Sequence, residues 1–506
     1  MPNKYLDVDL VTKTLGPGYT QHVTEAIMIN EPLHYHNGAN GKYMVERYFS
    51  YRASTTFGDC GSLLFASDLN YYPNPILGMH IAALTDTTNQ AYSNVLTKEK
   101  IAEAIKFFDP IEDNSPPIND FKYYKPDRFD FIHSTFRTAS QTKLPVEMSN
   151  RTMLRKTQSL YEIFGECPVA PAAMGPYVYK GIRINPLTTA TSRYEQTSPH
   201  IPEELMMACA QDMLDDIISN STPFKYTELS FEEAVAGIPG VPYMDGLSRK
   251  TSAGYPFCKE KPPNTKGKQA LFGKMGLYEF DSRYAEEIKQ EVSEILDNAR
   301  KGRRMLHIYA DFLKDELRPR AKVSKPRLVS CAPIQYSIAY RMILLPVHSW
   351  FMCNRIKNGF AVGINPYTEF TELAYHLQQD PPESFIAGDF SGFDTRINSS
   401  FEKAVAFVYK GVMKDKIDQD PSIGTAIDVL LMDIFSSVHI ARDTVYYWTS
   451  GQPSGNPGTT IINCIINRIL IRMCWVRVNN RNISSISSFR HSVKDVVYGD
   501  DNIISV

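Results

Sequence analysis

The stretch "SVKDVVYGDDNIISV" (Ser492–Val506) places two adjacent aspartates between two short runs rich in valine, isoleucine and tyrosine. With Gly499 just ahead of the pair, this pattern predicts a tight β-hairpin that presents Asp500 and Asp501 at its turn. Carboxylate oxygens held together in this way are a good mount for divalent cations. An Asp-Asp turn alone is far more often a plain surface hairpin, so the motif needs a partner.

A second segment, "SFIAGDFSGFDTRI" (384–397), is the candidate partner. Its apolar run predicts a buried strand that ends at Asp389, and Asp394 follows beyond a glycine. A carboxylate at the end of a buried strand is costly without a counter-ion. Two strands from distant parts of the chain, each ending in aspartate, can meet around two metal ions about 4 Å apart, an arrangement that promotes phosphoryl transfer. For this motif alone, the alternative that Asp389 only caps a turn stays open.

A third segment, "SGQPSGNPGTTIINCIINR" (450–468), is rich in glycine and proline before it becomes apolar. It predicts a flexible loop that leads into a helix, with Thr459 or Thr460 as the N-cap and Asn463 in the first turns. A glycine-rich loop at a helix N-terminus can hold a ribose or a phosphate, although many such loops are plain turns.

A fourth segment, "KDELRPRAKVSKPRLVS" (314–330), carries six lysines and arginines against two carboxylates. A run of this kind is usually a solvated surface. A polyanionic substrate requires one like it, and arginine in particular can hold phosphate through two parallel hydrogen bonds.

Composition narrows the class of protein. The 506 residues are 43% hydrophobic, which is enough for at least two domains, and the net charge of −2 excludes a uniformly basic coat for nucleic acid. The eight cysteines form no CxxC pair, which indicates a reducing compartment without a structural zinc site. No run of about 18 uninterrupted apolar residues exists to span a bilayer. The nearest candidate is residues 459–478, and it is broken by Asn463, Asn467, Arg468 and Arg472.

Along the chain, the patterns change character twice. Residues 1 to about 95 alternate short β-prone runs with turn residues, and a brief helical pattern follows. A polar, proline-rich junction extends to about residue 149. Beyond it, three amphipathic helices are predicted at 202–218, 283–301 and 336–352, with compact strands between them. The sequence therefore predicts a small all-β domain followed by a larger α+β domain.

In this order and spacing, the segments that contain Asp389, the glycine-rich loop and Asp500 resemble motifs A, B and C of the RNA-dependent RNA polymerases of picornavirus-like viruses. Two upstream segments agree with this. "RKTSAGYPF" (249–257) resembles the fingers motif that lines the template entry, and 314–330 resembles the motif that grips the incoming triphosphate. The resemblance implies a multidomain chain whose residues 151–506 form the fingers and part of the palm of a right-hand polymerase, without its thumb.

The resemblance also implies a reaction and a site. The 3′-hydroxyl of a primer, paired to an RNA template, attacks the α-phosphate of a bound NTP, and pyrophosphate leaves. The metal-binding residues are Asp389, Asp500 and Asp501, for two Mg²⁺ ions or Mn²⁺ in their place. The residues that bind the nucleotide are Lys314, Arg318, Lys322, Arg327, Asp394, Ser454, Gly455, Thr459 and Asn463. The residues that bind the template are Thr251, Ser252, Ala253, Gly254, Tyr255 and Pro256.

Two rival functions remain. Reverse transcriptases also carry an Asp-Asp turn, but they place a bulky aromatic residue where this chain has Asp394. A carboxylate there can accept a hydrogen bond from a ribose 2′-hydroxyl, which favours ribonucleotides. The second rival, a catalytically inactive protein that binds RNA, is disfavoured because the catalytic positions are intact.

The front of the chain contains a different motif. "TTFGDCGSLLF" (55–65) places Cys60 in a turn whose glycines let backbone N–H groups converge as an oxyanion hole. A lone cysteine is usually inert packing, but "PILGMHIAAL" follows shortly afterwards. Together they resemble the C-terminal barrel of the chymotrypsin-like cysteine proteases of picornavirus-like viruses. The resemblance implies that Cys60 is the nucleophile and that Thr55 and His80 line the S1 pocket that reads glutamine.

We therefore expect residues 1–100 to be a partial protease barrel and 101–150 to be a junction that contains the cleavage region, with Gln90 and Gln141 as candidate sites. Only 59 residues precede Cys60, too few for the first barrel that supplies a general base. The chain is thus expected to be an internal part of a viral polyprotein that neither cleaves peptides nor extends RNA efficiently by itself. The family further implies the host cytoplasm, membrane-associated replication complexes and a protein primer.

Overall fold

The structure is a computed structural model. It describes residues 5–13, 19–36, 42–53, 55, 61–66, 76–84, 88–108, 137–141, 145–155, 167–179, 182–195, 201–260, 262, 265–378, 384–448, 450–479 and 482–506. The chain divides into two compact units, Met1–Pro110 and Ile111–Val506.

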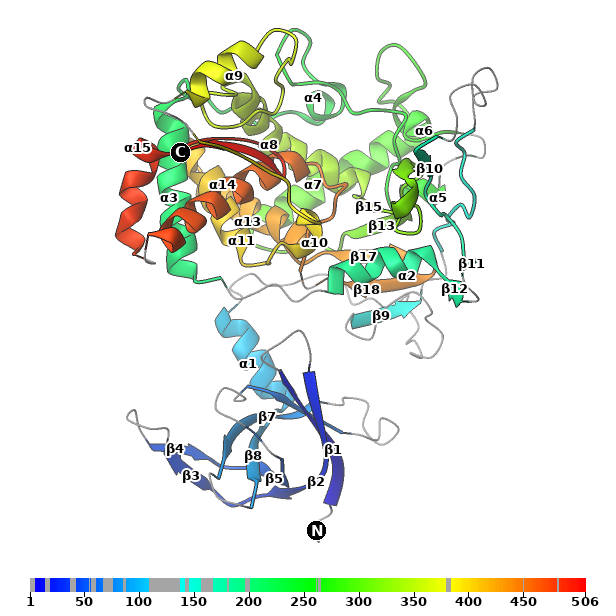
Figure 1. Ribbon diagram of the computed structural model, residues 1–506. Helices are drawn as coiled ribbons and strands as arrows, with labels where there is room; N and C mark the ends of the chain where they lie inside the picture. The colour runs from blue at the N-terminus through cyan, green and yellow to red at the C-terminus, as the bar shows by residue number, and fades with distance from the viewer. Residues whose placement is uncertain are drawn as a thin grey trace. The chain divides into compact units, whose positions relative to one another are not determined.

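The first unit contains a closed antiparallel barrel (Figure 1). In barrel order its strands are β1 (Tyr5–Lys13), β2 (Tyr19–Ile29), β5 (Tyr48–Arg52), β8 (Gln90–Val95), β7 (Ile76–Ala83) and β6 (Leu63–Ala66). The hairpin of β3 (Leu33–His36) and β4 (Lys42–Val45) and the helix α1 (Lys98–Phe108) complete the unit. Val8 and Leu10, two positions apart on β1, are fully buried, as the side-chain period of a strand requires. The predicted all-β segment and the short helix after it are confirmed.

The second unit contains a five-stranded sheet. Its order is β15 (Leu328–Cys331), β13 (Ile308–Leu313), β17 (Val438–Ala441), β18 (Thr444–Tyr447) and β9 (Arg137–Gln141). The β13–β17 pair is parallel and the other pairs are antiparallel. The candidate cleavage residue Gln141 is therefore paired into this sheet, opposite Thr444. The other candidate, Gln90, is the first residue of the barrel strand β8.

Long helices form most of the core of the second unit. They are α3 (Glu203–Ser219), α7 (Arg283–Arg300), α8 (Ile334–Cys353), α11 (Phe401–Val412), α13 (Pro421–Phe435) and α14 (Thr459–Val478). The three predicted helices correspond to α3, α7 and α8. Fourteen of the twenty residues of α8 are buried, so this helix is enclosed rather than amphipathic. Within the described part of the chain, no helix is both long enough and apolar enough to cross a membrane.

Shorter helices and strands lie between and after the long helices and the strands of the five-stranded sheet in the sequence. The helices are α2 (Pro186–Thr191), α4 (Phe231–Ala236), α5 (Phe257–Glu260), α6 (Gln269–Phe272), α9 (Phe370–Leu377), α10 (Phe393–Arg396), α12 (Lys414–Gln419) and α15 (Phe489–Ser492), with 3₁₀ turns η2 (Ser192–Glu195), η3 (Arg320–Lys322) and η4 (Ile483–Ser488). The two-stranded sheets are β10 (Val169–Pro171) with β14 (Leu317–Pro319), and β11 (Tyr177–Tyr179) with β12 (Ile182–Ile184).

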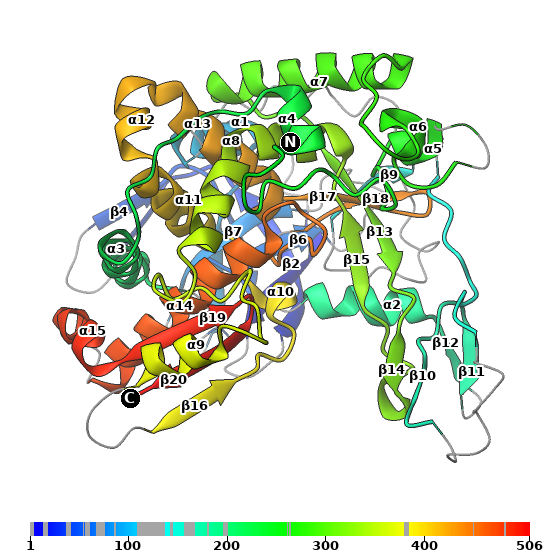
Figure 2. The ribbon, with the colours of Figure 1, turned by 90° about the horizontal axis from the view of Figure 1, so that it is seen from above.

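A three-stranded antiparallel sheet carries the two aspartate-containing segments that the sequence singled out. Its order is β16 (Phe385–Gly388), β20 (Asp501–Ser505) and β19 (Lys494–Tyr498), and Figure 2 shows the three strands side by side. Phe385 and Ile386 are 54% and 53% exposed, so the prediction that this strand is buried was wrong. The reason is that β16 forms the edge of the sheet, where one side of the strand has no neighbouring strand among the described residues.

Candidate active site

The hairpin predicted around the paired aspartates is confirmed. Tyr498 pairs with Asp501, so Gly499 and Asp500 form a two-residue turn between β19 and β20. Gly499 has φ of +63°, a backbone conformation that residues with a side chain rarely adopt. Glycine at the first turn position is typical of type II′ hairpins, whose twist matches that of the flanking strands. Asp500 is therefore held at the tip of the turn, and Asp501 begins the next strand.

The neighbouring strand brings the first aspartate to the same place. Gly388, the last residue of β16, pairs with Asn502 of β20, so Asp389 follows directly beside the turn. Asp389 and Asp500 line one cavity of about 860 Å³. Partial burial raises the pKa of Asp500, and the like charges of Asp501 and Asp389 raise it further. Within the described residues, none of these three carboxylates forms an ion pair, and the charge of Arg327 offsets the raised pKa of Asp500 only in part.

Asp394 lies on the same cavity and contacts the motif-B helix. It is on α10, which begins after a left-handed Gly392, and it accepts a hydrogen bond of 2.7 Å from the side-chain amide of Asn463. Burial raises the pKa of Asp394 to about 6, and the charge of Asp500 adds to this, whereas the hydrogen bond from Asn463 opposes it. The structure thus brings together two of the residues assigned to nucleotide binding.

Ser454 and Thr459, the other nucleotide-binding candidates with a side chain in or next to the glycine-rich loop, contact backbone carbonyl oxygens. Ser454 lines the cavity and lies 3.4 Å from the carbonyl of Leu328. The hydroxyl of Thr459 contacts carbonyl oxygens of its own loop, at 3.2 Å for Ser454 and 2.9 Å for Asn456. The prediction of Thr459 or Thr460 as the helix N-cap was wrong, because Gly458 is the N-cap and no side chain caps α14.

Gly455 packs directly against β15. An ideal Cβ at this position would lie 2.2 Å from the carbonyl oxygen of Ser330, so only glycine allows the loop to approach the strand this closely.

The cationic segment is organised by one of its own carboxylates. Glu316 accepts hydrogen bonds from two nitrogens of Arg327, one of them at 2.6 Å, and lies 3.5 Å from both Arg318 and Lys314. The hydrogen bonds from Arg327 lower the pKa of Glu316 despite partial burial. The cavity that Asp389 and Asp500 line is also lined by Lys314, Arg318, Lys322 and Arg327. In the sequence, Glu316 is only one of two carboxylates that reduce the net positive charge of the segment. In the structure, it lies at the centre of the lysine and arginine cluster.

Arg193 is a cavity residue that the sequence did not indicate. It lies on η2, lines the cavity, and donates a hydrogen bond of 3.0 Å to the carbonyl of Lys325. Burial lowers the pKa of Arg193, and repulsion by Arg318 and Arg327 lowers it further. A single arginine more than a hundred positions ahead of the cationic segment gives no signal in the sequence, because only the fold brings it there.

The segment assigned to template binding is held in place by contacts with Ala332 and Lys268. Its members are Thr251, Ser252, Ala253, Gly254, Tyr255 and Pro256. Gly254 has φ of +69°, and a Cβ there would lie 2.1 Å from the carbonyl oxygen of Ala332. The buried ammonium of Lys268 contacts the hydroxyl of Thr251 at 2.5 Å and two backbone carbonyls at 3.3 and 3.4 Å. These contacts fix the shape of the segment while Thr251 and Ser252 stay exposed.

A Ser–His–Asp arrangement elsewhere in this unit has the contacts of a hydrolase triad but no access. Ser437 lies 2.7 Å from one ring nitrogen of His439, and the other ring nitrogen lies 2.9 Å from Asp311. All three side chains are at most 1% exposed, so no substrate can reach the hydroxyl. The group instead joins β13 to β17.

In the first unit, His80 is buried in the barrel on β7. Its Nδ1 lies 2.8 Å from the hydroxyl of Tyr51, which in turn lies 2.7 Å from Ser93. Thr55 is partly buried, and Cys60 lies outside the described residues. Tyr51 gave no signal in the sequence, where it is one of several aromatic residues in β-prone runs.

Comparison with known proteins identifies the second unit. Residues 157–506 match the family model for viral RNA-dependent RNA polymerase. A solved Sicinivirus 3Dpol RNA-dependent RNA polymerase is 25% identical, with a TM-score of 0.58, over 73% of this chain and 71% of that one.

Two viral polyproteins are similar over most of the chain. The replicase polyprotein of Drosophila C virus (strain EB) is 30% identical over 489 residues, which are 92% of this chain and 27% of the relative. The replicase polyprotein of Cricket paralysis virus is 29% identical over 485 residues, which are 90% of this chain and 27% of the relative. The chain therefore spans about a quarter of the length of these relatives. By the family match over most of its length, the chain belongs to the viral RNA-dependent RNA polymerases.

Proposed function

We propose that this chain carries the nucleotidyl-transfer site of a picorna-like virus replicase and joins ribonucleotides on an RNA template. The observation that carries the proposal is the shared cavity, which is lined by Asp389 and Asp500 and also by a cluster of lysines and arginines. Carboxylates and cations around one cavity suit a substrate whose triphosphate must be bound while its α-phosphate reacts.

The residues present fit divalent metal ions. Asp389 and Asp500 offer hard oxygen ligands, and the raised pKa of Asp500 reflects partial burial together with like charges that a cation would relieve. Across the described residues, no three acidic, histidine or cysteine side chains form a ready metal cluster, so oxygens of the substrate would complete the coordination. When bound, two Mg²⁺ ions, or Mn²⁺, would supply Lewis acidity for the transfer. Asp501 would act nearby by adding negative charge.

The cation cluster would bind the triphosphate. Lys314, Arg318 and Arg327 stand around Glu316, which holds their charged ends on the cavity. Guanidinium groups positioned in advance lose little freedom when they bind phosphate, which favours tight and oriented binding. Lys322 and Arg193 line the same cavity and would add to this charge.

Asp394 and Asn463 would recognise the ribose. With a pKa of about 6, Asp394 is mostly ionised at neutral pH and can accept a hydrogen bond from a 2′-hydroxyl. This favours RNA synthesis over reverse transcription. In the full-length protein, Asp394→Ala should reduce the preference for NTPs over dNTPs by about tenfold or more. A preference equal to that of the wild type would contradict this role.

The template, the primer and the cellular setting follow the same proposal. Residues 251–256 would contact the template strand, and an RNA or protein primer would supply the reacting hydroxyl. The resemblance to replicases supports action in the host cytoplasm at membrane-associated replication complexes.

For the first unit, we propose the second barrel of the polyprotein-processing cysteine protease, with Cys60 as the nucleophile. Because residues 1–110 are about a fifth of the chain, an alignment over 92% of it includes part of this unit. The Nδ1 contact with Tyr51 fixes the ring of His80, which suits a group that must read a glutamine side chain with Thr55. In the full-length protein, Cys60→Ala should stop cleavage of a glutamine-containing peptide, and Cys167→Ala should not.

The decisive experiment for polymerisation compares two removals of negative charge in the full-length protein. Asp500→Asn should abolish primer extension while RNA binding stays near that of the wild type. Asp418→Asn, an exposed change on α12, is the matched control and should extend normally. Primer extension by Asp500→Asn at the wild-type rate would overturn the proposed function. The proposal would then no longer be separated from the alternative of an inactive RNA-binding protein.

A further inference from the structure

One asparagine of α14 contacts the backbone of the turn that carries Asp500. The side-chain amide nitrogen of Asn467 lies 3.1 Å from the carbonyl oxygen of Gly499, 3.0 Å from that of Asp500 and 3.2 Å from that of Asp501. Asn467 is fully buried. Its two N–H groups are therefore shared among three consecutive carbonyls, and no other side chain among the described residues is recorded on all three.

A second residue of α14, Cys464, contacts the same turn. Gly499 donates its backbone N–H to the sulfur of Cys464 at 3.0 Å. Cys464 precedes Asn467 by three positions, so both side chains lie on one face of the helix. Asn463, one turn before Asn467, contacts Asp394 at 2.7 Å. Successive turns of one helix thus contact the ribose-binding carboxylate and the metal-binding turn.

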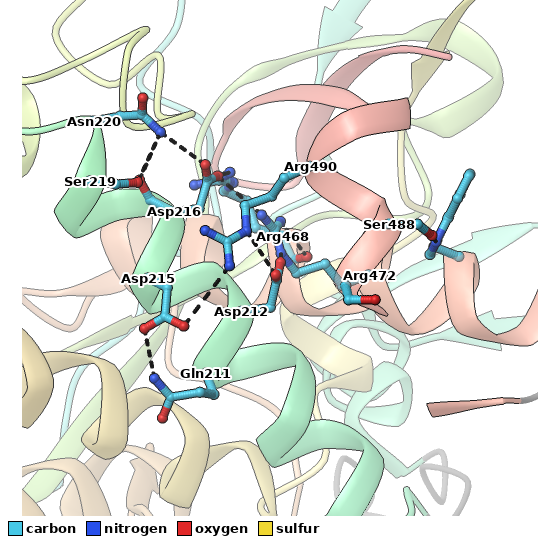
Figure 3. A network of polar contacts seen from close by, with 12 residues as sticks. Gln211, Asp212, Asp215, Asp216, Ser219, Asn220, Arg468, Arg472, Ser488 and Arg490 are labelled. Carbon is cyan, nitrogen blue, oxygen red and sulfur yellow. Dashed lines mark hydrogen bonds and ion pairs between the residues drawn. The ribbon is translucent and has the colours of Figure 1, made fainter. Parts of the chain in front are cut away.

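The helix itself is anchored by a buried ion network, shown in Figure 3. Arg468 donates hydrogen bonds of 2.6 Å to Asp495 of β19 and to Asp216 of α3. Arg472, one turn later, donates at 2.9 Å to Asp212 of α3. Both arginines are at most 1% exposed. A helix tied in this way to α3 and to the base of the hairpin is a fixed support for the turn.

We infer that Asn467 is a positioning residue whose amide sets the place of the Gly499–Asp501 backbone, and with it the distance between the carboxylates of Asp500 and Asp389. This rests on the proposed metal-dependent function. Asn467 does not touch substrate or metal. It acts through the turn, because the carboxylate of Asp500 can move only as far as its backbone allows.

The substitution Asn467→Asp isolates this role. Aspartate has nearly the same shape, but it replaces the donor with an oxygen that faces three carbonyl oxygens, so the turn must shift or loosen. Asn467→Ser is the second variant, because a hydroxyl fits the space and can donate to only one carbonyl. Asn358→Asp is the matched control: Asn358 is equally buried and bonds the backbone of Phe351 and Phe360, but no residue of the turn.

Three measurements in the full-length protein test the inference. For both Asn467 variants, kcat for nucleotide addition should fall by about ten- to a hundredfold, the effect of a misplacement of about 1 Å, with KM for NTP nearly unchanged. The Mg²⁺ concentration for half-maximal rate should rise several-fold. In the purified chain without metal, amide hydrogen exchange across residues 496–504 should be faster than in the wild type.

The control separates positioning from general stability. Asn358→Asp should lower the melting temperature and leave the Mg²⁺ requirement unchanged. The inference is overturned if both Asn467 variants keep the wild-type Mg²⁺ requirement and turn exchange, or if Asn358→Asp raises the requirement equally. Either result, with Asp500→Asn inactive, would leave the proposed function standing.

Discussion

Aspartates lie at both ends of the β19–β20 hairpin, and the charges around them differ. At the base, Asp495 is paired with the buried Arg468 and Arg472. At the tip, Asp500 lies beside Asp501 and Asp389 with no ion pair among the described residues. The residue type is the same and the two positions are five residues apart. The two positions also differ in burial, because Asp495 is buried and Asp500 only partly buried, but the balance of charge around them is opposite.

The direction of the pKa changes expresses this difference. Burial alone would raise the pKa of Asp495, but the charges of Arg468 and Arg472 outweigh it and lower the pKa to about 2. At the tip, burial and like charges together raise the pKa of Asp500. A compensated carboxylate holds structure together, whereas an uncompensated cluster is destabilising until a cation binds. Within one hairpin, Asp495 therefore serves to stabilise the fold, whereas Asp500 is available to bind a metal ion.

The largest expected effect is at the tip. Asp389→Asn in the full-length protein should lower the rate of primer extension by about a thousandfold or more, equivalent to about 4 kcal/mol of transition-state stabilisation. Its melting temperature without metal should equal or exceed that of the wild type, because a repulsive charge has been removed. A marked loss of thermal stability would show that the tip cluster is structural and would break the comparison.

At the base, the same change should act on folding. Asp495→Asn leaves Arg468 and Arg472 buried with less compensation, which should lower the free energy of unfolding by about 3–5 kcal/mol. Denaturant unfolding of the second unit measures this. If stability is unchanged, the buried network does not hold the hairpin as we describe.

The pH dependence of stability should sharpen the contrast. Asp495 has a pKa of about 2 in the folded state, below its ordinary value of about 4, so its contribution is complete above pH 4 and is lost as pH falls from about 4 to 2. The loss should be about 2 kcal/mol by pH 2. Asp495→Asn should flatten this part of the unfolding curve, while Asp500→Asn should leave it unchanged.

The smallest effect is expected at the solvent edge of the network. Arg490 contacts Asp212 at 2.9 Å and Asp215 at 3.9 Å (Figure 3). Its side chain is 38% exposed. Arg490→Ala should therefore cost less than about 1 kcal/mol of unfolding free energy. A loss of unfolding free energy as large as that of Asp495→Asn would mean that solvent exposure does not weaken the ion pairs of this network.

Part of this arrangement was predictable from the sequence. The hairpin at Gly499 and the Asp-ended strand before Asp389 follow local rules of turn chemistry and periodicity. The cationic segment could be recognised by its charge, although the organising role of Glu316 could not. The errors at β16 and Thr459 arose because edge position and capping depend on which elements become neighbours.

The supporting network was visible in the sequence only as an interruption. In the sequence, Asn467, Arg468 and Arg472 are polar residues that break an apolar run and exclude a membrane span there. The partners of the two arginines on α3 lie more than two hundred positions earlier, so nothing local identifies these pairs. In this fold, the polar residues that interrupt the apolar helix α14 are the ones that fix the position of the aspartate turn.

The central claim is that the carboxylates of Asp389 and Asp500 bind divalent metal together. Crystals of the protein soaked in Mn²⁺ should give an anomalous diffraction peak within coordination distance of both side chains, and Asp500→Asn crystals should lose it. Mn²⁺ peaks elsewhere, with none between these two carboxylates, would contradict the account.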